Sequence, residues 1–141
     1  MEIVYFYHQD ISVCPVKEYL SQYLLAAKDK EFLIKRKAKI LADIDAKISY
    51  IGANGGRPRP PFAKPLRSYS CFEILNSKDT NTVIRILYFT HQNKMILLHA
   101  FEKPANYSTE RERKRVEKQN KLGEEYLNIF KLNPNNYEKY E

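Results

Sequence analysis

The sequence predicts a single α+β domain that spans residues 1–141. Three observations support this class: a strand-length apolar run at the N-terminus, a long region with apolar residues at helical spacing, and three later strand-like runs that precede a last helical segment. The chain is long enough to bury a core and shorter than the length at which chains usually divide into two domains.

The N-terminal third predicts one strand and a helical hairpin. Ile3 to Tyr7 is a short β-branched and aromatic run, which is typical of a strand. Pro15 then begins a stretch with helical spacing, and proline is tolerated in a first helical turn. After a break near Lys28, a second helical stretch runs to Gly52, a natural residue at a helix C-terminus. The apolar positions of the two helices are Val16, Tyr19, Leu20, Tyr23, Leu24 and Ala27, then Phe32, Leu33, Ile40, Leu41, Ile44, Ile48 and Ile51.

The hairpin is followed by a basic loop. Residues 52–67 contain three of the four glycines and four of the seven prolines, which rules out a helix or a central strand. The wider stretch from Ala46 to Phe72 has five basic residues and no acidic one. Such a loop suits a polyanion, because neutralising phosphates releases counterions. The alternative is a solvated loop that only keeps the protein soluble.

The runs 72–75, 82–90 and 94–101 predict three strands joined by polar turns, and therefore an antiparallel meander. The last two runs are apolar at nearly every position, so both faces of the sheet must be covered. The helical hairpin accounts for one face. We expect something else, such as a partner protein, on the other.

Thr109 and Glu112 form a capping box that begins a last helix. Its apolar residues gather towards its end, and its first half is charged. Residues 133–141 are polar and are expected to be frayed.

The composition indicates the cellular compartment and the kind of partner. Cys14 and Cys71 form neither a disulfide framework nor a zinc motif, which indicates a reducing, cytoplasmic compartment. The apolar run at the N-terminus is too short for a signal peptide or a membrane span, so we expect no membrane partner. The net charge of +7 points to an anionic partner, with nucleic acid first.

Five strings, in order, resemble the phage-related HigB-like branch of the RelE/ParE toxin superfamily, from about Val4 to Leu127. They are residues 15–20 (PVKEYL), 64–67 (KPLR), 72–74 (FEI), 85–89 (RILYF) and 97–101 (LLHAF). The resemblance implies a RelE-like fold and the toxin of a type II toxin–antitoxin pair, an endoribonuclease that cuts mRNA, commonly on the ribosome. It also implies a HigA-like helix-turn-helix antitoxin as partner, with DNA contacted only through that antitoxin. The antitoxin would then account for the second sheet face.

Cutting RNA through its own 2′-hydroxyl needs a base, an acid and positive charge on the phosphate. No metal is needed in principle, and the three histidines and scattered carboxylates lack ligand spacing, so we expect no metal or cofactor. Arg85 interrupts an apolar run and matches the strand arginine of the family, which makes it a candidate phosphate clamp. The alternative is an arginine that only pairs with Glu73 on the neighbouring strand.

Two further residues are candidates for catalysis. His99 suits an acid or base because imidazole titrates near neutrality, although a lone histidine in an apolar strand is more often a satisfied core residue. Lys103 follows the last strand, where the family carries a basic cluster near the scissile phosphate. Tyr88 either stacks on a base or packs in the core, and core packing is favoured.

Lys64 and Arg67 match the family's basic entry to the sheet and are candidates to bind RNA phosphates. Two positions where the family tends to be basic are Leu75 and Pro104 here, so Arg57 and Arg59 from the loop would have to substitute. Otherwise catalysis is weak or the target differs. The alternatives are therefore a ParE-type inhibitor of DNA gyrase and a non-catalytic module that binds nucleic acid or the antitoxin.

Overall fold

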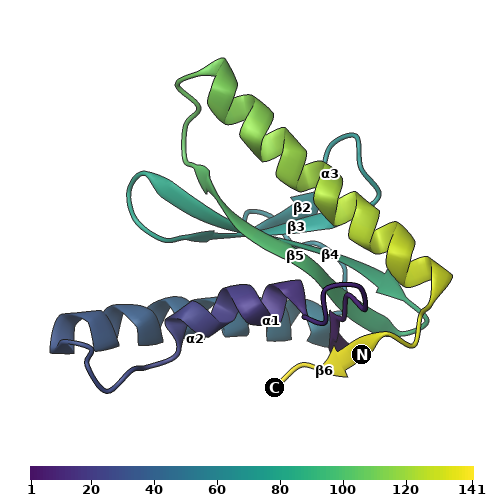
Figure 1. Cartoon of the computed structure of the whole chain (residues 1–141), viewed down its shortest axis with the longest axis horizontal. Coiled ribbons are helices and arrows are strands. Elements are labelled where there is room, and N and C mark those ends of the chain that lie inside the picture. Colours follow the sequence, from purple (N-terminus) through teal and green to yellow (C-terminus); the bar gives the residue numbers. More distant parts are fainter.

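One open six-stranded sheet forms the centre of the protein, as a computed structural model of all 141 residues shows (Figure 1). Its spatial order is β2-β3-β4-β5-β1-β6. β3, β4 and β5 form the predicted antiparallel meander, and the N-terminal strand β1 pairs in parallel with β5. The strands are β1 (Glu2–Phe6), β2 (Ala63–Pro65), β3 (Phe72–Ser77), β4 (Thr82–His91), β5 (Lys94–Pro104) and β6 (Tyr137–Lys139).

The predicted helical hairpin is confirmed, with a shorter first arm. Helix α1 (Pro15–Leu20) continues only as a 3₁₀ turn, η1 (Ser21–Tyr23), because Leu24 adopts an extended backbone with ψ of 143°. Leu24 and its neighbour Leu25 are exposed, so no burial supports a longer helix there. Helix α2 (Glu31–Ala53) carries the long second arm.

The last helix, α3 (Glu110–Leu132), covers the second face of the sheet. Figure 1 shows it across the sheet from α1 and α2. Val116, Leu127 and Phe130 are buried there against strand residues. The second cover of the sheet, for which a partner protein was one candidate, is therefore the apolar end of the chain's own helix. The capping box is confirmed: the Thr109 hydroxyl accepts from the Glu112 backbone N–H, and the Glu112 carboxylate accepts from that of Thr109.

The C-terminal tail is ordered, contrary to the expectation of fraying. Strand β6 pairs antiparallel with β1, with Tyr137 opposite Phe6. The Tyr140 hydroxyl donates to Asp45 on α2, and its ring lies 5.3 Å from that of Tyr5. The sequence of the tail is polar, and its order comes from these pairings with distant segments.

A β-bulge in β5 decides which residues share a face. His99 is paired with Leu87 and Leu97 with Tyr88, so Leu98 is the extra residue. Leu97 therefore faces the helical hairpin, whereas His99 faces α3. Regular alternation would have placed Leu97 and His99 on one face. The bulge brings His99 to the face that also carries Arg85.

None of the helices has the length and apolar character needed to cross a lipid bilayer.

Candidate functional site

A buried pair of charges lies between the sheet and α3. Arg85 on β4 and Glu73 on β3 are diagonal neighbours, and Arg85 Nε is 2.7 Å from Glu73 Oε2. Their side chains are only 10% and 2% exposed. Asn120 on α3 completes the contact, because its Oδ1 accepts from Arg85 Nη1 at 3.0 Å. The ion pair that the sequence offered as the alternative for Arg85 is thus present.

The hydrogen bonding of this pair is incomplete. Neither Arg85 Nε nor Glu73 Oε2 has an aligned hydrogen-bond partner, although both atoms are buried. Folded proteins satisfy nearly all buried polar atoms, and an exception calls for an explanation, such as strain, a bound water or ion, or a catalytic role. A buried charge pair with unused hydrogen-bonding capacity is therefore a candidate for binding or catalysis.

Two lysines stand on the same face beside the pair. Lys64 lies opposite Glu73 in the sheet, with Nζ 3.7 Å from Oε1 and a side chain that is 58% exposed. Lys103 on β5 is half-buried. We call Lys64, Arg85 and Lys103, grouped around Glu73, the basic cluster. Three cations around one carboxylate leave an excess of positive charge, which favours an anion such as a phosphate.

The pKa of Lys103 is lowered from its ordinary value, first by burial and next by the positive charge of Arg85. Its Nζ donates to the carbonyl of Pro104 at 3.3 Å and lies 5.2 Å from the centre of the Tyr107 ring. A lysine whose pKa is lowered gives up its proton more readily than an exposed lysine does. Of the basic cluster, Lys103 is the member whose environment suits proton transfer.

The two positions where basic residues were expected fall next to this cluster. Leu75 lies directly opposite Arg85 in the sheet, and Pro104 ends β5 after Lys103. The substitute role suggested for Arg57 and Arg59 has no support from contacts, because no hydrogen bond or ion pair joins either residue to the basic cluster. Arg59 instead approaches Asn54 Oδ1 at 3.5 Å. The exposed Arg67 likewise has no such contact with the cluster.

His99 is enclosed by α3. Its Nε2 is 2.8 Å from Gln119 Oε1, and its ring lies against those of Phe101 and Tyr126. Its Nδ1 is buried without a partner. Burial lowers the pKa of His99. The imidazole is therefore held neutral at pH 7, and neither ring nitrogen is free to meet a substrate while α3 is in place.

We expect His99 to make folding less stable in mild acid. Its folded pKa lies below the unfolded value, so the unfolded state binds the proton more tightly. The stabilising contribution is present above about pH 6.5 and is lost as the pH falls below that value. Urea unfolding between pH 7.5 and 5 should show a steeper loss for the wild type than for His99→Gln, and parallel curves would contradict this.

Tyr88 belongs to the core. It lies on the face of the helical hairpin, is completely buried, packs on Phe72 at 5.4 Å, and donates its hydroxyl to the Gly56 carbonyl at 3.1 Å. A base cannot reach this ring, so the stacking alternative is corrected in favour of core packing.

Sequence reasoning missed three residues that contact the candidate site. Asn120 and Gln119 hold Arg85 and His99, and Tyr107 lies beside Lys103. Their positions depend on how α3 crosses the sheet, which no local pattern reveals. In the sequence, the signal at these positions is only the charged character of the first half of α3.

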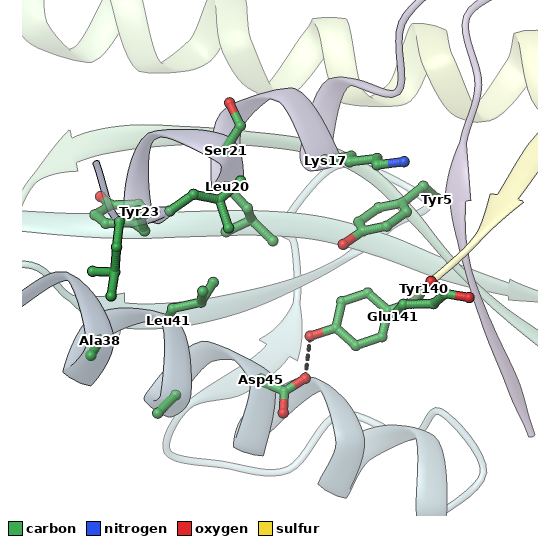
Figure 2. Close-up of a pocket in the computed structure, with 13 residues that line it drawn as sticks. Tyr5, Lys17, Leu20, Ser21, Tyr23, Ala38, Leu41, Asp45, Tyr140 and Glu141 are labelled. Atoms are coloured by element: carbon green, nitrogen blue, oxygen red, sulfur yellow. Dashed lines mark hydrogen bonds between the residues drawn. The ribbon is translucent and has the colours of Figure 1, made fainter. Parts of the chain in front are cut away.

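A cavity lies on the opposite face of the protein. It has a volume of about 650 Å³ and lies between α1, η1, α2 and the C-terminal tail (Figure 2). Leu20, Leu41 and Tyr5 line it, and the exposed Leu24 and Leu25 stand at its edge. None of the catalytic or RNA-binding residues predicted from the sequence lines this cavity.

One comparison with known proteins found a family that matches most of the chain. The model of the family described as phage-derived protein Gp49-like (DUF891) matches residues 31–121. The matched segment contains the whole basic cluster and the two α3 residues that contact Arg85 and His99. No curated protein and no solved structure matches the chain. The family match covers more than half of the chain, and the chain therefore belongs to the phage-derived Gp49-like family, a family of RelE-like, toxin-like proteins.

Proposed function

We propose that this protein is a HigB-like toxin of a type II toxin–antitoxin system that cuts mRNA without a metal ion, on translating ribosomes. Membership of the Gp49-like family supports the toxin setting. The observation that carries the nuclease is the basic cluster, in which three cations converge on one face around a single buried carboxylate.

Each member of the cluster has a role in this proposal. Arg85 and Lys64 hold the scissile phosphate and stabilise the negative charge that it gains as the 2′-oxygen attacks. Lys103 is the proton-transfer group in this proposal, because burial lowers its pKa below the ordinary value of lysine. Glu73 positions Arg85 and Lys64, from which it lies 2.7 and 3.7 Å. His99 contributes as an acid or base only if α3, which carries Gln119, moves away from the imidazole.

A second candidate function is a non-catalytic module that binds RNA. The observation that favours it is the contact of α3 with the candidate residues: Asn120 binds Arg85, and Gln119 binds His99. If α3 stays in place during binding, Lys64 is the only member of the basic cluster that presents a largely exposed charge to a phosphate.

We further propose a HigA-like helix-turn-helix antitoxin as the protein partner. The cavity on the helical hairpin supports a protein partner, because Leu24 and Leu25 are 61% and 60% exposed beside it. The neighbouring segment 28–39 has six basic and two acidic residues. This charge complements an acidic amphipathic segment, which we assign to the antitoxin.

Primer extension on a reporter mRNA tests the nuclease. The wild type, Lys103→Gln and Arg36→Gln are each induced briefly, with and without a block on translation. Lys103 makes no ion pair with a carboxylate, so its replacement should leave the fold intact, and Arg36 is an exposed control. We expect new 5′ ends with the wild type and Arg36→Gln, and a loss of roughly 100-fold with Lys103→Gln, the lower end of the effect of a general acid or base.

The other outcomes separate the alternatives. Loss of the cuts under the translation block supports action on the ribosome, and their loss when the helix-turn-helix product of an adjacent reading frame is co-expressed supports the antitoxin. Growth arrest with intact mRNA contradicts the nuclease and directs the next assay to DNA supercoiling by gyrase. RNA binding without cuts favours the non-catalytic module.

A further inference from the structure

The first three turns of α3 carry a concentration of unpaired cations. All six basic side chains of this segment are exposed, and none takes part in an ion pair. Elsewhere in the chain, exposed cations such as Lys17 and Lys39 do have carboxylate partners. The six residues are Arg111, Arg113, Lys114, Arg115, Lys118 and Lys121.

The acidic residues of the same segment do not neutralise them. Glu112 is occupied by the helix cap, where it accepts from Ser108 and Thr109. Glu117 accepts from the Tyr69 hydroxyl on the loop between β2 and β3. Only Glu110 has no such contact. With six basic and three acidic residues from Glu110 to Lys121, the segment keeps an excess of three positive charges.

Four of the cations form a row on the outer face of the helix. Arg111, Lys114, Lys118 and Lys121 are spaced by three, four and three residues, which places them on one side. Val116, on the opposite side, is buried against the sheet. The row is about 15 Å long, at the usual rise of an α-helix. We call these four residues the α3 row; the helix that carries it lies on the side of the sheet opposite α2 (Figure 1).

Tyr107 connects this region to the basic cluster. Its ring centre is 5.1 Å from the guanidinium of Arg113 on α3 and 5.2 Å from Lys103 Nζ on β5. A polyanion held by Lys103 would therefore continue onto α3 past Arg113. The helix and the cluster form one positively charged surface built from elements that are distant in the sequence.

We propose that the α3 row is a second RNA-binding site, which holds backbone phosphates of nucleotides beyond the one that is cut. This inference rests on the proposed RNA substrate, and it adds a site outside the sheet. The depression beside the row is lined only by charged residues, namely Arg111, Glu112, Lys114, Arg115 and Lys118. Protein interfaces are depleted of lysine and of charge at their centre, whereas phosphate contacts use lysine and arginine. RNA fits this surface better than an acidic protein does.

The test compares two variants with the same change in charge. The first is Arg111→Gln/Lys114→Gln/Lys118→Gln on α3, and the second is Lys28→Gln/Lys30→Gln/Lys35→Gln on the helical hairpin. All six side chains are exposed, so both proteins should fold, and circular dichroism and thermal melting check this. The probe is a 20-nucleotide RNA with 2′-O-methyl groups throughout, which binds but cannot be cut through its 2′-oxygen.

We expect the α3 variant to bind this RNA at least about tenfold more weakly at low salt, with the hairpin variant close to wild type. The slope of log affinity against log salt concentration should fall by about 2 for the α3 variant, because each lost contact with a single strand removes about 0.7. A five-nucleotide RNA too short to reach from the cluster along the row should bind both variants alike.

The outcomes are distinguishable from those of the proposed function. If the wild type binds RNA but cuts none, weaker binding by the α3 variant alone still supports the second site. If the wild type cuts RNA, the α3 variant should raise KM and leave kcat unchanged. Equal RNA affinity and equal salt slopes for the two variants would overturn the inference, as would a defect of the α3 variant with polyglutamate and none with RNA.

Discussion

Arg85→Ala is expected to lower the free energy of unfolding by about 3–5 kcal/mol, a large share of the stability of a domain of this size. The reason is that the buried Glu73 carboxylate loses its partner. Glu73 is 1% exposed, and without Arg85 its nearest cation is Lys64 at 3.7 Å, whose side chain is largely in solvent. Urea unfolding followed by circular dichroism at pH 7 measures the loss.

Two further variants identify the cause. Arg36→Ala removes a different arginine, which pairs with Asp79. Both side chains of that pair are 40–50% exposed, so we expect the free energy of unfolding to change by less than about 1 kcal/mol. Glu73→Leu/Arg85→Leu removes both charges and should recover most of the stability, because apolar residues often replace a buried ion pair without loss. A loss below about 1 kcal/mol for Arg85→Ala, or no recovery in the double variant, would contradict this explanation. The buried Glu73 carboxylate without its partner would then not be the cause of the destabilisation.

The recovery has a consequence for function. If an apolar pair folds as well as Glu73 and Arg85, stability does not require these charges at this place. Their presence under α3, with Arg85 Nε and Glu73 Oε2 lacking aligned hydrogen bonds, then fits a site that uses the charge on a ligand. The double variant should be folded and should fail to cut RNA, which separates the structural role of the pair from its proposed role in catalysis.

Much of the fold was predictable because local patterns determine it. The meander follows from strand-length runs separated by polar turns, the helical hairpin from apolar spacing, and the start of α3 from the Thr109 capping box. The end of the hairpin was predicted less well, because Gly52 lies inside α2, which ends at Ala53, and the first glycine with a left-handed φ is Gly55. Each of these signals lies within about ten residues of the structure that it specifies. The structure therefore agrees with the sequence at most places where the cause is local; a further exception is α1, which ends at Leu20 although the apolar spacing continues to Ala27.

The differences arise where distant segments meet. The bulge at Leu98 depends on the register between β4 and β5, and it moves His99 to the face of Arg85. Strand β6 exists because Tyr137 pairs with Phe6 at the other end of the chain. In the sequence, Asn120 is one of many polar positions on a charged helix, and its contact with Arg85 depends on where α3 crosses the sheet. No short-range pattern contains these facts.

Phe130→Ala is expected to destabilise the protein by about 3–5 kcal/mol, because it opens a cavity where α3 is fixed to the sheet. Phe130 is completely buried, and its ring lies 5.6 Å from those of both Phe89 and His91 at the end of β4. For a chain of this length, each kcal/mol corresponds to about 2–4 °C, so the melting temperature should fall by roughly 10 °C.

Leu132→Ala is the matched control, since this side chain is two residues further along the same helix and 86% exposed. It should change the free energy of unfolding by no more than about 0.5 kcal/mol. If Phe130→Ala melted like the wild type, the packing of α3 on the sheet would contribute little, and Asn120 would not be held over Arg85 by that helix. A large loss with Phe130→Ala alone would instead show that α3 is a fixed layer of the fold. Access of RNA to Arg85 would then require the helix to shift against that packing.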